Sequence, residues 1–302
     1  MKTLADESLN KINLVGKLLD ATFDTGKTQA GAPYERAKLT VRVTQTYGGK
    51  EETSEIPVSM FATQFTKKGG TNPAYKSIQD LKGMRTAQAD GYDEADVISL
   101  TGTTISENAY VSKSGKVVDG WQLRSSFVNK AKLNSVGSFN LDIYILGMKP
   151  EEDRDGDTTG RFIVRGALVQ YAGRIDVIDF IVEDPAAVEF IENNWEVDQT
   201  VNIKGRIRVT SLEVASEKSE SSWGEDIPET TTRYIRELII TKGDDQGKDE
   251  EFAYDPVEIK KGLNARKANM EQLQIDAQGK GKSSGKAAAP AAKAKPNYGW
   301  EE

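Results

Sequence analysis

The stretch ERAKLTVRVTQT, Glu35–Thr46, alternates apolar and polar side chains with a period of two. Its apolar positions are alanine, leucine and valine. Its polar positions carry Arg36, Lys38 and Arg42 along with threonines. Alternation of this kind, rich in β-branched residues, is typical of a strand with one buried face. The sequence therefore predicts a sheet whose exposed face is basic at this strand.

Four more strands and one helix are predicted around this stretch. With it, the strands cover residues 11–23, 35–46, 56–62, 97–105 and 120–128, and Asn72-Pro73 opens a helix to Leu81. Asparagine before proline is typical of a helix N-cap followed by its first residue. Three strands, a helix and two strands is the order of an OB-type barrel. Gly16 interrupts the first strand, where a small barrel needs a bend.

A second block has the same element order. Its strands are predicted at residues 139–146, 161–171, 174–182, 200–210 and 233–241, with a helix at 185–195 and loops at 149–160 and 216–230. Two short repeats support a duplication: Ile12–Gly16 resembles Phe162–Gly166, and Val97–Gly102 resembles Thr200–Gly205. The predicted fold is all-β dominated, with two OB-like five-stranded barrels, each with a short helix, plus a C-terminal helix and disordered tail.

The predicted domains are residues 1–133, 134–245 and 246–302. In the third, a helix is predicted from Pro256 to about Ala277, followed by a low-complexity linker at 279–296. The chain ends in two aromatic and two acidic side chains: Tyr298, Trp300, Glu301 and Glu302. Such an aromatic anchor with acidic neighbours fits a partner's pocket with a basic rim, and a frayed terminus is the alternative.

Composition excludes several classes of function. The chain has no cysteine and no histidine, which removes disulfides, thiolate catalysis, Ser-His-Asp triads and the commonest metal ligands. We therefore predict that the protein is not an enzyme and has no catalytic residues, metal site or cofactor. No apolar run approaches the length of a membrane helix, and the start shows no apolar signal region, so a cytoplasmic protein without membrane contact is expected.

The net charge of −7 is unevenly distributed. Residues 1–133 carry 18 Lys/Arg and 15 Asp/Glu, a net charge of +3, whereas residues 134–245 carry 12 and 23, a net charge of −11. Residues 246–302 have a net charge of +1. Because local charge decides where a polyanion binds, the first block is the better candidate.

The candidate binding residues are the cations of two strand faces and the aromatic and basic side chains near them. They are Arg36, Lys38, Arg42, Tyr34, Tyr47, Phe61, Phe65, Lys67, Lys68, Trp121, Arg124, Lys204, Arg206 and Arg208. Single-stranded nucleic acid is held by cationic grooves in which bases stack on aromatic rings. The alternative interpretation of each basic stripe is a solvated strand face.

The chain resembles the single-stranded DNA-binding proteins of bacteriophages and related mobile elements. Ile12–Leu18 is similar to the opening strand of bacterial single-stranded DNA-binding proteins, and the linker with its acidic, aromatic tip is similar to their general layout. The tip departs from the bacterial one, which usually ends in aspartates, proline and phenylalanine. The resemblance implies sequence-independent binding of single-stranded DNA, protection of replication or recombination intermediates and recruitment of partner proteins.

The leading hypothesis is thus a tandem-OB single-stranded DNA-binding protein of phage type, active in DNA replication or recombination, which recruits replication or recombination proteins through its tail. DNA and RNA both fit this reasoning, as do a monomer and a homo-oligomer. The alternative is a β-rich structural or assembly protein of a virion with no nucleic-acid role.

Overall fold

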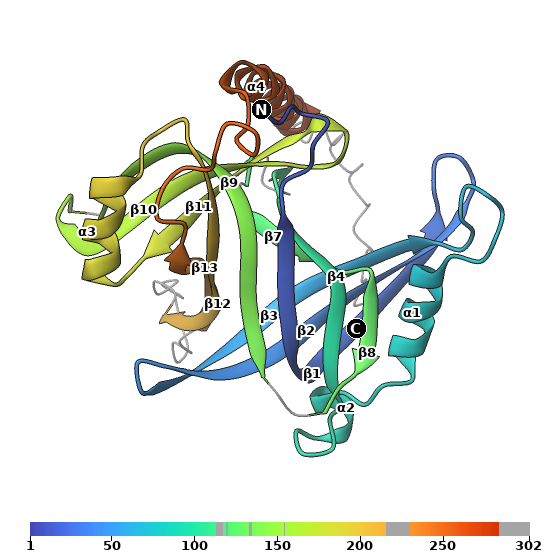
Figure 1. Cartoon of the computed structure of the whole chain (residues 1–302). Coiled ribbons are helices and arrows are strands. Elements are labelled where there is room, and N and C mark those ends of the chain that lie inside the picture. Colours follow the sequence, from blue (N-terminus) through green and yellow to red (C-terminus); the bar gives the residue numbers. More distant parts are fainter. Residues whose placement is uncertain (113–116, 119, 133–134, 154, 216–229, 284–302) are drawn as a thin grey trace, which may run out of the picture.

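The computed structural model describes residues 1–112, 117–118, 120–132, 135–153, 155–215 and 230–283. Within these residues one eleven-stranded sheet runs through the molecule in the order β10-β11-β13-β12-β9-β1-β2-β3-β7-β4-β8. Further pairings of β1 with β4 and of β9 with β10 curl this sheet into two barrels. The helices α1 (Pro73–Lys82) and α3 (Pro185–Asn194) lie on opposite flanks, and α4 (Pro256–Ser283) lies above the strands in Figure 1.

The first barrel closes around five strands. They are β1 (Asn10–Lys27), β2 (Pro33–Tyr47), β3 (Lys50–Thr63), β4 (Val97–Glu107) and β7 (Trp121–Arg124). β1 pairs with β2 and β4, β2 with β3, and β7 with β4, all antiparallel, while β3 and β7 pair in parallel. The smaller elements are α1 (Pro73–Lys82), α2 (Ala87–Asp90), β5 (Tyr110–Val111), β6 (Val117–Val118) and β8 (Phe127–Lys130).

The second barrel repeats this topology. Its strands are β9 (Val136–Glu152), β10 (Thr158–Val169), β11 (Ile175–Val182), β12 (Thr200–Ala215) and β13 (Thr230–Gly243), with a 3-10 turn at Tyr171–Gly173 and α3 (Pro185–Asn194) between β11 and β12. β9 pairs antiparallel with β10 and β12, and β11 pairs in parallel with β13. Both barrels therefore have the OB strand order, and the predicted fold class is confirmed.

Three details of the prediction are wrong. Phe162–Gly166 lies in β10, the second strand of its barrel, so its likeness to Ile12–Gly16 does not mark equivalent strands. Residues 120–128 form two short strands, β7 and β8, that both pair with β4. The predicted loop at 149–160 is mostly strand, because β9 continues to Glu152 and β10 begins at Thr158.

The two barrels are joined edge to edge along their first strands. Asn10–Val15 of β1 pairs antiparallel with Val136–Leu141 of β9, and Figure 1 shows these strands side by side at the centre. We call this junction the seam. Since the pairing makes one continuous sheet, the division at residues 133 and 134 stays a prediction.

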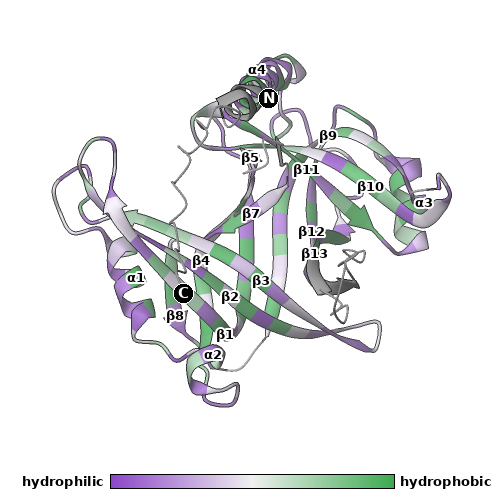
Figure 2. Ribbon diagram, turned by 180° about the vertical axis from the view of Figure 1, so that it is seen from behind, coloured by the Kyte–Doolittle hydropathy of each residue, from purple (hydrophilic) through white to green (hydrophobic). Residues whose placement is uncertain are grey.

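Alternation of side chains places the core as the sequence suggests. Ala37, Leu39 and Val41 of β2 are fully buried, and Figure 2 shows the strands of the first barrel banded in hydrophobic and hydrophilic colours. The inward-facing Glu35 is also buried, and Lys82 and Gln79 of α1 bind its carboxylate. The Asn72 side chain accepts a hydrogen bond from the Ala74 amide at 3.0 Å, which caps α1 as predicted.

The C-terminal helix α4 (Pro256–Ser283) begins at the predicted residue and continues past Ala277. Before it, Tyr254 is buried with Ile175 and Ile259, and Lys2 pairs with Tyr254, so the segment that leads into α4 and the N-terminal residues are packed on the second barrel. Arg266 of α4 forms an ion pair with Glu107 of β4 at 2.5 Å. Among the helices that the structure describes, none has the length and apolar character needed to cross a membrane.

Candidate functional site

A groove crosses the outer face of the first barrel over β2, β3, β7 and β4. Its central row is fixed by strand pairing, because Lys38 pairs with Ser59, Ser59 with Arg124, and Arg124 with Thr104. Arg36 lies two residues before Lys38 on the same face and pairs with Phe61. We call this hollow, of about 580 Å³, the barrel groove. Four strands spaced about 4.8 Å apart make it about 14 Å wide.

The barrel groove combines an exposed aromatic ring with cations. Phe61 is 53% exposed, so that much of its ring is open to solvent. Its ring centroid lies 5.2 Å from that of Tyr34, and the Arg36 guanidinium lies 6.0 Å from the centre of the Tyr34 ring. These side chains share one face, because positions 34, 36 and 38 alternate with the buried residues of β2.

The barrel groove is also free of counter-charges. None of the described residues that line it is acidic, and within the described part of the chain Arg36, Lys38 and Arg124 have no ion pair. The β1 partner of Arg36 is Asp24, which lies outside the lining residues. Three cations that have no ion pair among the described residues, on a surface about 14 Å wide, form a local positive field in a chain of net negative charge.

Arg42 and Tyr47, the other candidates on β2, have partners elsewhere. The Arg42 guanidinium binds Glu55 at 2.5 Å and lies 5.0 Å from the Tyr92 ring. The Glu55 hydrogen bond raises the Arg42 pKa. Tyr47 is near the tip of the β2–β3 hairpin, where the centre of its ring lies 4.5 Å from the Arg206 guanidinium. Burial raises the pKa of Tyr47. The structure therefore does not bring these two side chains into the barrel groove.

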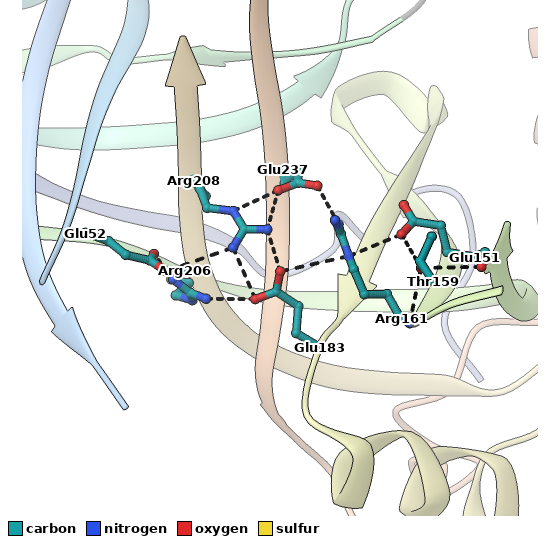
Figure 3. A network of polar contacts seen from close by, with 8 residues as sticks. All are labelled: Glu52, Glu151, Thr159, Arg161, Glu183, Arg206, Arg208 and Glu237. Carbon is teal, nitrogen blue, oxygen red and sulfur yellow. Dashed lines mark hydrogen bonds and ion pairs between the residues drawn. The ribbon is translucent and has the colours of Figure 1, made fainter. Parts of the chain in front are cut away.

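Two of the three cations of the second predicted basic stripe are covered rather than open to solvent. Arg206 and Arg208 lie on the outer face of β12 as predicted, but Glu52 from the β2–β3 hairpin covers them, and Arg206 is buried. Figure 3 shows them in one network with Arg161 and further carboxylates. The carboxylates are those of Glu52, Glu151, Glu183 and Glu237. Lys204 alone of this stripe is exposed and without an ion pair among the described residues.

The pKa values in this network reflect burial and pairing. Burial raises the pKa of Glu237, but hydrogen bonds from Arg161 and Arg208 outweigh it, so that its pKa lies below the ordinary value. Burial, together with the like charge of Arg208, lowers the pKa of Arg206. The arginines on this face of the second barrel are thus neutralised by carboxylates, whereas Arg36, Lys38 and Arg124 of the first barrel have no ion pair among the described residues.

Other candidates lie beside the barrel groove or away from it. Phe65, Lys67 and Lys68 are exposed in the loop directly after β3. Trp121 packs against the core, because on β7 it alternates with the outward-facing Gln122 and Arg124. The candidate tip residues Tyr298, Trp300, Glu301 and Glu302, and residues 284–296 of the predicted linker, lie outside the described residues.

Sequence reasoning did not identify every residue that lines the barrel groove, and Ser59, Thr104 and Gln122 are three of those it missed. Alternation could have found two of them, since Ser59 lies two residues before Phe61 and Gln122 two before Arg124. Thr104 needed the pairing of β4 with β7. Among the described residues no group of three or more carboxylates could hold a metal ion.

Comparison with known proteins gives a family. The YorF family model matches residues 8–276, and no curated protein matches the chain. Similar solved structures include the wild-type single-stranded DNA binding protein from Thermus aquaticus, at 12% identity and a TM-score of 0.49, covering 81% of this chain and 96% of that one. A deletion mutant of that protein gives 14% identity and a TM-score of 0.48, with 80% and 97% covered. Since the family model covers most of the sequence, the chain belongs to the YorF family.

Proposed function

We propose that the protein binds single-stranded DNA without sequence preference in the barrel groove. The observation that carries this proposal is a set of three cations around the exposed ring of Phe61: Arg36, Lys38 and Arg124 have no ion pair, and the groove has no acidic lining residue, in the part of the chain that the structure describes. Phosphates bind to such cations through charge alone, and a base stacks on an aromatic ring whatever its identity. The binding is therefore expected to be tolerant of sequence and sensitive to salt.

The same geometry favours a single strand over a duplex. In a duplex the faces of the bases are already stacked on one another, so the rings of Phe61 and Tyr34 have nothing to stack against. Stacking on an aromatic side chain contributes roughly 1–3 kcal/mol per base. Binding that depends on this contribution is lost when the bases are paired.

The wider role follows from binding of this kind. A protein that covers single strands without chemistry protects intermediates of DNA replication or recombination, and we extend the proposal to that role in a bacteriophage or mobile element. The aromatic and acidic tip, Tyr298–Glu302, is proposed to recruit replication or recombination proteins. The domain limits at residues 1–133, 134–245 and 246–302 belong to the same proposal.

Fluorescence anisotropy with labelled oligo-dT, a duplex of equal length and oligo-U tests the proposal. We expect tight binding to oligo-dT that weakens with salt, and no comparable binding to the duplex. Equal affinity for oligo-dT and oligo-U would make RNA an equal ligand and overturn the choice of DNA. Absence of binding to all three would overturn the function and favour a structural role in a virion.

A further inference from the structure

We propose that a single strand leaving the barrel groove continues over β4 and along the seam to Lys204 of the second barrel. This inference rests on the proposed function and extends it to a longer binding path. The seam carries a hollow of about 710 Å³ on the outer face of β4, β1, β9 and β12. We call this hollow the seam groove.

The chemistry of the seam groove suits a nucleic-acid backbone. Lys11 pairs with Asn140, and Asn140 pairs with Lys204, so two lysines and an amide form one row across β1, β9 and β12. Both lysines are exposed, and neither has an ion pair within the described part of the chain. The other lining side chains include amides and hydroxyls such as Asn13 and Ser138, and none of those described is acidic.

The two grooves meet at one place on β4. Gly102 and Thr104 line both of them, and Thr104 ends the row of Lys38, Ser59 and Arg124. Gly102 has a φ of +63°, a conformation that favours glycine, and it places no side chain at the crossing. The path is therefore continuous and open where it passes from one groove to the other.

The carboxylate next to the seam groove does not oppose a phosphate. Asp142 follows Asn140 on the same face of β9, but its side chain is nearly buried. Lys248 binds one of its oxygens at 2.8 Å, and the Asn202 amide donates to the same oxygen at 2.9 Å. Its charge is thus balanced by a fixed ammonium group.

The matching groove of the second barrel is not an alternative route. Arg161, Arg206 and Arg208 are held there by Glu52, Glu183 and Glu237, which face the place that a phosphate would need. Arg206 also borders the seam groove, but its ion pairs leave it no free charge. Among the described residues that line the seam groove, Lys11 and Lys204 are therefore the cations that remain open to a strand leaving the barrel groove. Three strand spacings from β4 to β12 add about 14 Å to the path.

The test compares short and long oligo-dT, from about 4 to about 30 nucleotides, which brackets the site sizes of roughly 4–16 nucleotides for one such barrel. The variant Lys11→Ala/Lys204→Ala removes the seam cations. The control Lys76→Ala/Lys260→Ala removes the same charge from exposed positions on α1 and α4. Because each phosphate contact contributes about 0.7 to the salt slope of single-strand binding, the seam variant should lose about 1.4 with long oligonucleotides only.

Three outcomes decide the inference. Support requires that wild-type affinity and salt slope rise with length and that the seam variant, but not the control, loses this rise. If the seam variant behaves as the control does while short oligonucleotides still bind, the seam inference is overturned and the barrel groove stands. If wild type binds no oligonucleotide of any length, the proposed function fails, and the inference fails with it.

A second measurement does not depend on removing charge. The chain has no cysteine, so Thr101→Cys gives a single thiol at an exposed seam position for an environment-sensitive dye. Long oligo-dT should change the dye's emission, and a short oligonucleotide that saturates the barrel groove should not. An unchanged emission at saturating long oligo-dT would contradict the path.

Discussion

Replacement of Arg208 by alanine tests whether the second barrel's arginines stabilise the fold rather than bind a ligand. Arg208 contacts Glu183 and Glu237, the latter at 2.5 Å, and links β12 to β13 and to the residue after β11. The substitution leaves both carboxylates with fewer partners in a region of low solvent exposure. The free energy of unfolding is therefore expected to fall.

The size of the loss follows from burial. Removing one partner of a fully buried ion pair costs about 3–5 kcal/mol. Here Glu237 is 14% exposed and keeps Arg161, while Glu183 keeps Arg206, so we expect about 2 kcal/mol, below that range. The control is Arg165→Ala, since Arg165 pairs with Asp179 at the surface, where an ion pair contributes about 0–1 kcal/mol.

Urea unfolding gives the stability, and anisotropy with a short oligo-dT gives the binding. We expect Arg208→Ala to lower the unfolding midpoint more than the control does, with unchanged affinity for the short oligonucleotide. Adding Glu237→Gln should restore part of the stability, because it removes one uncompensated charge. Equal midpoints for Arg208→Ala and Arg165→Ala, or an affinity loss with Arg208→Ala, would refute the reasoning.

Three further substitutions or conditions have defined outcomes. Phe61→Ala should weaken oligo-dT binding by about 1–3 kcal/mol in a titration, whereas Phe252→Ala, at a similarly exposed ring, should not change it. The Glu237 pKa is lowered in the fold, so the stabilisation from its ionised carboxylate is complete above the ordinary pKa of 4.5 and is lost as the pH falls below that value. Urea midpoints measured from neutral to acidic pH should show this loss of stability, and Glu237→Gln should make the loss smaller. Gly205→Ala should destabilise by about 1–3 kcal/mol or more in urea unfolding, since a Cβ there would overlap a backbone oxygen of β13, while Gly147→Ala meets open space.

The strand pattern of the sequence predicted most of the fold. The alternation from Arg36 to Thr44 recurs in the structure as a strand with one buried face, and Asn72 caps the helix that it was expected to open. The likeness of Val97–Gly102 to Thr200–Gly205 marks equivalent strands, β4 and β12. These features depend on local periodicity and turn chemistry, which a sequence carries directly.

The pairing of β1 with β9, which joins the two barrels, could not be predicted from local sequence patterns. The first strand of the second barrel contains Phe139-Asn140-Leu141, which is similar in sequence to Ile12-Asn13-Leu14 of β1 and pairs with Asn10–Ile12 of that strand. A short apolar run ending in glycine recurs too easily to identify equivalent strands, which is why Phe162–Gly166 of β10 resembles Ile12–Gly16 without being its structural counterpart. Pairing between distant strands is set by the packing of both barrels rather than by either segment.

The solvent exposure of the basic residues on β12 could not be predicted for a similar reason. Alternation correctly placed Arg206 and Arg208 on the outer face of β12, but it says nothing about what covers that face. Glu52, more than 150 positions earlier in the chain, covers them. Arg36, Lys38 and Phe61 were predictable because, in the part of the chain that the structure describes, no distant carboxylate forms an ion pair on their face.

The salt dependence of short oligo-dT binding tests the barrel groove most directly, with wild type compared to Arg36→Ala/Lys38→Ala/Arg124→Ala. Each phosphate contact contributes about 0.7 to the salt slope, so the triple variant should bind more weakly, with a slope lower by about 2. Lys76→Ala/Lys260→Ala should leave the slope unchanged. If the triple variant binds oligo-dT with unaltered affinity and salt slope, the binding site lies elsewhere, and the proposal that the barrel groove binds the strand is contradicted.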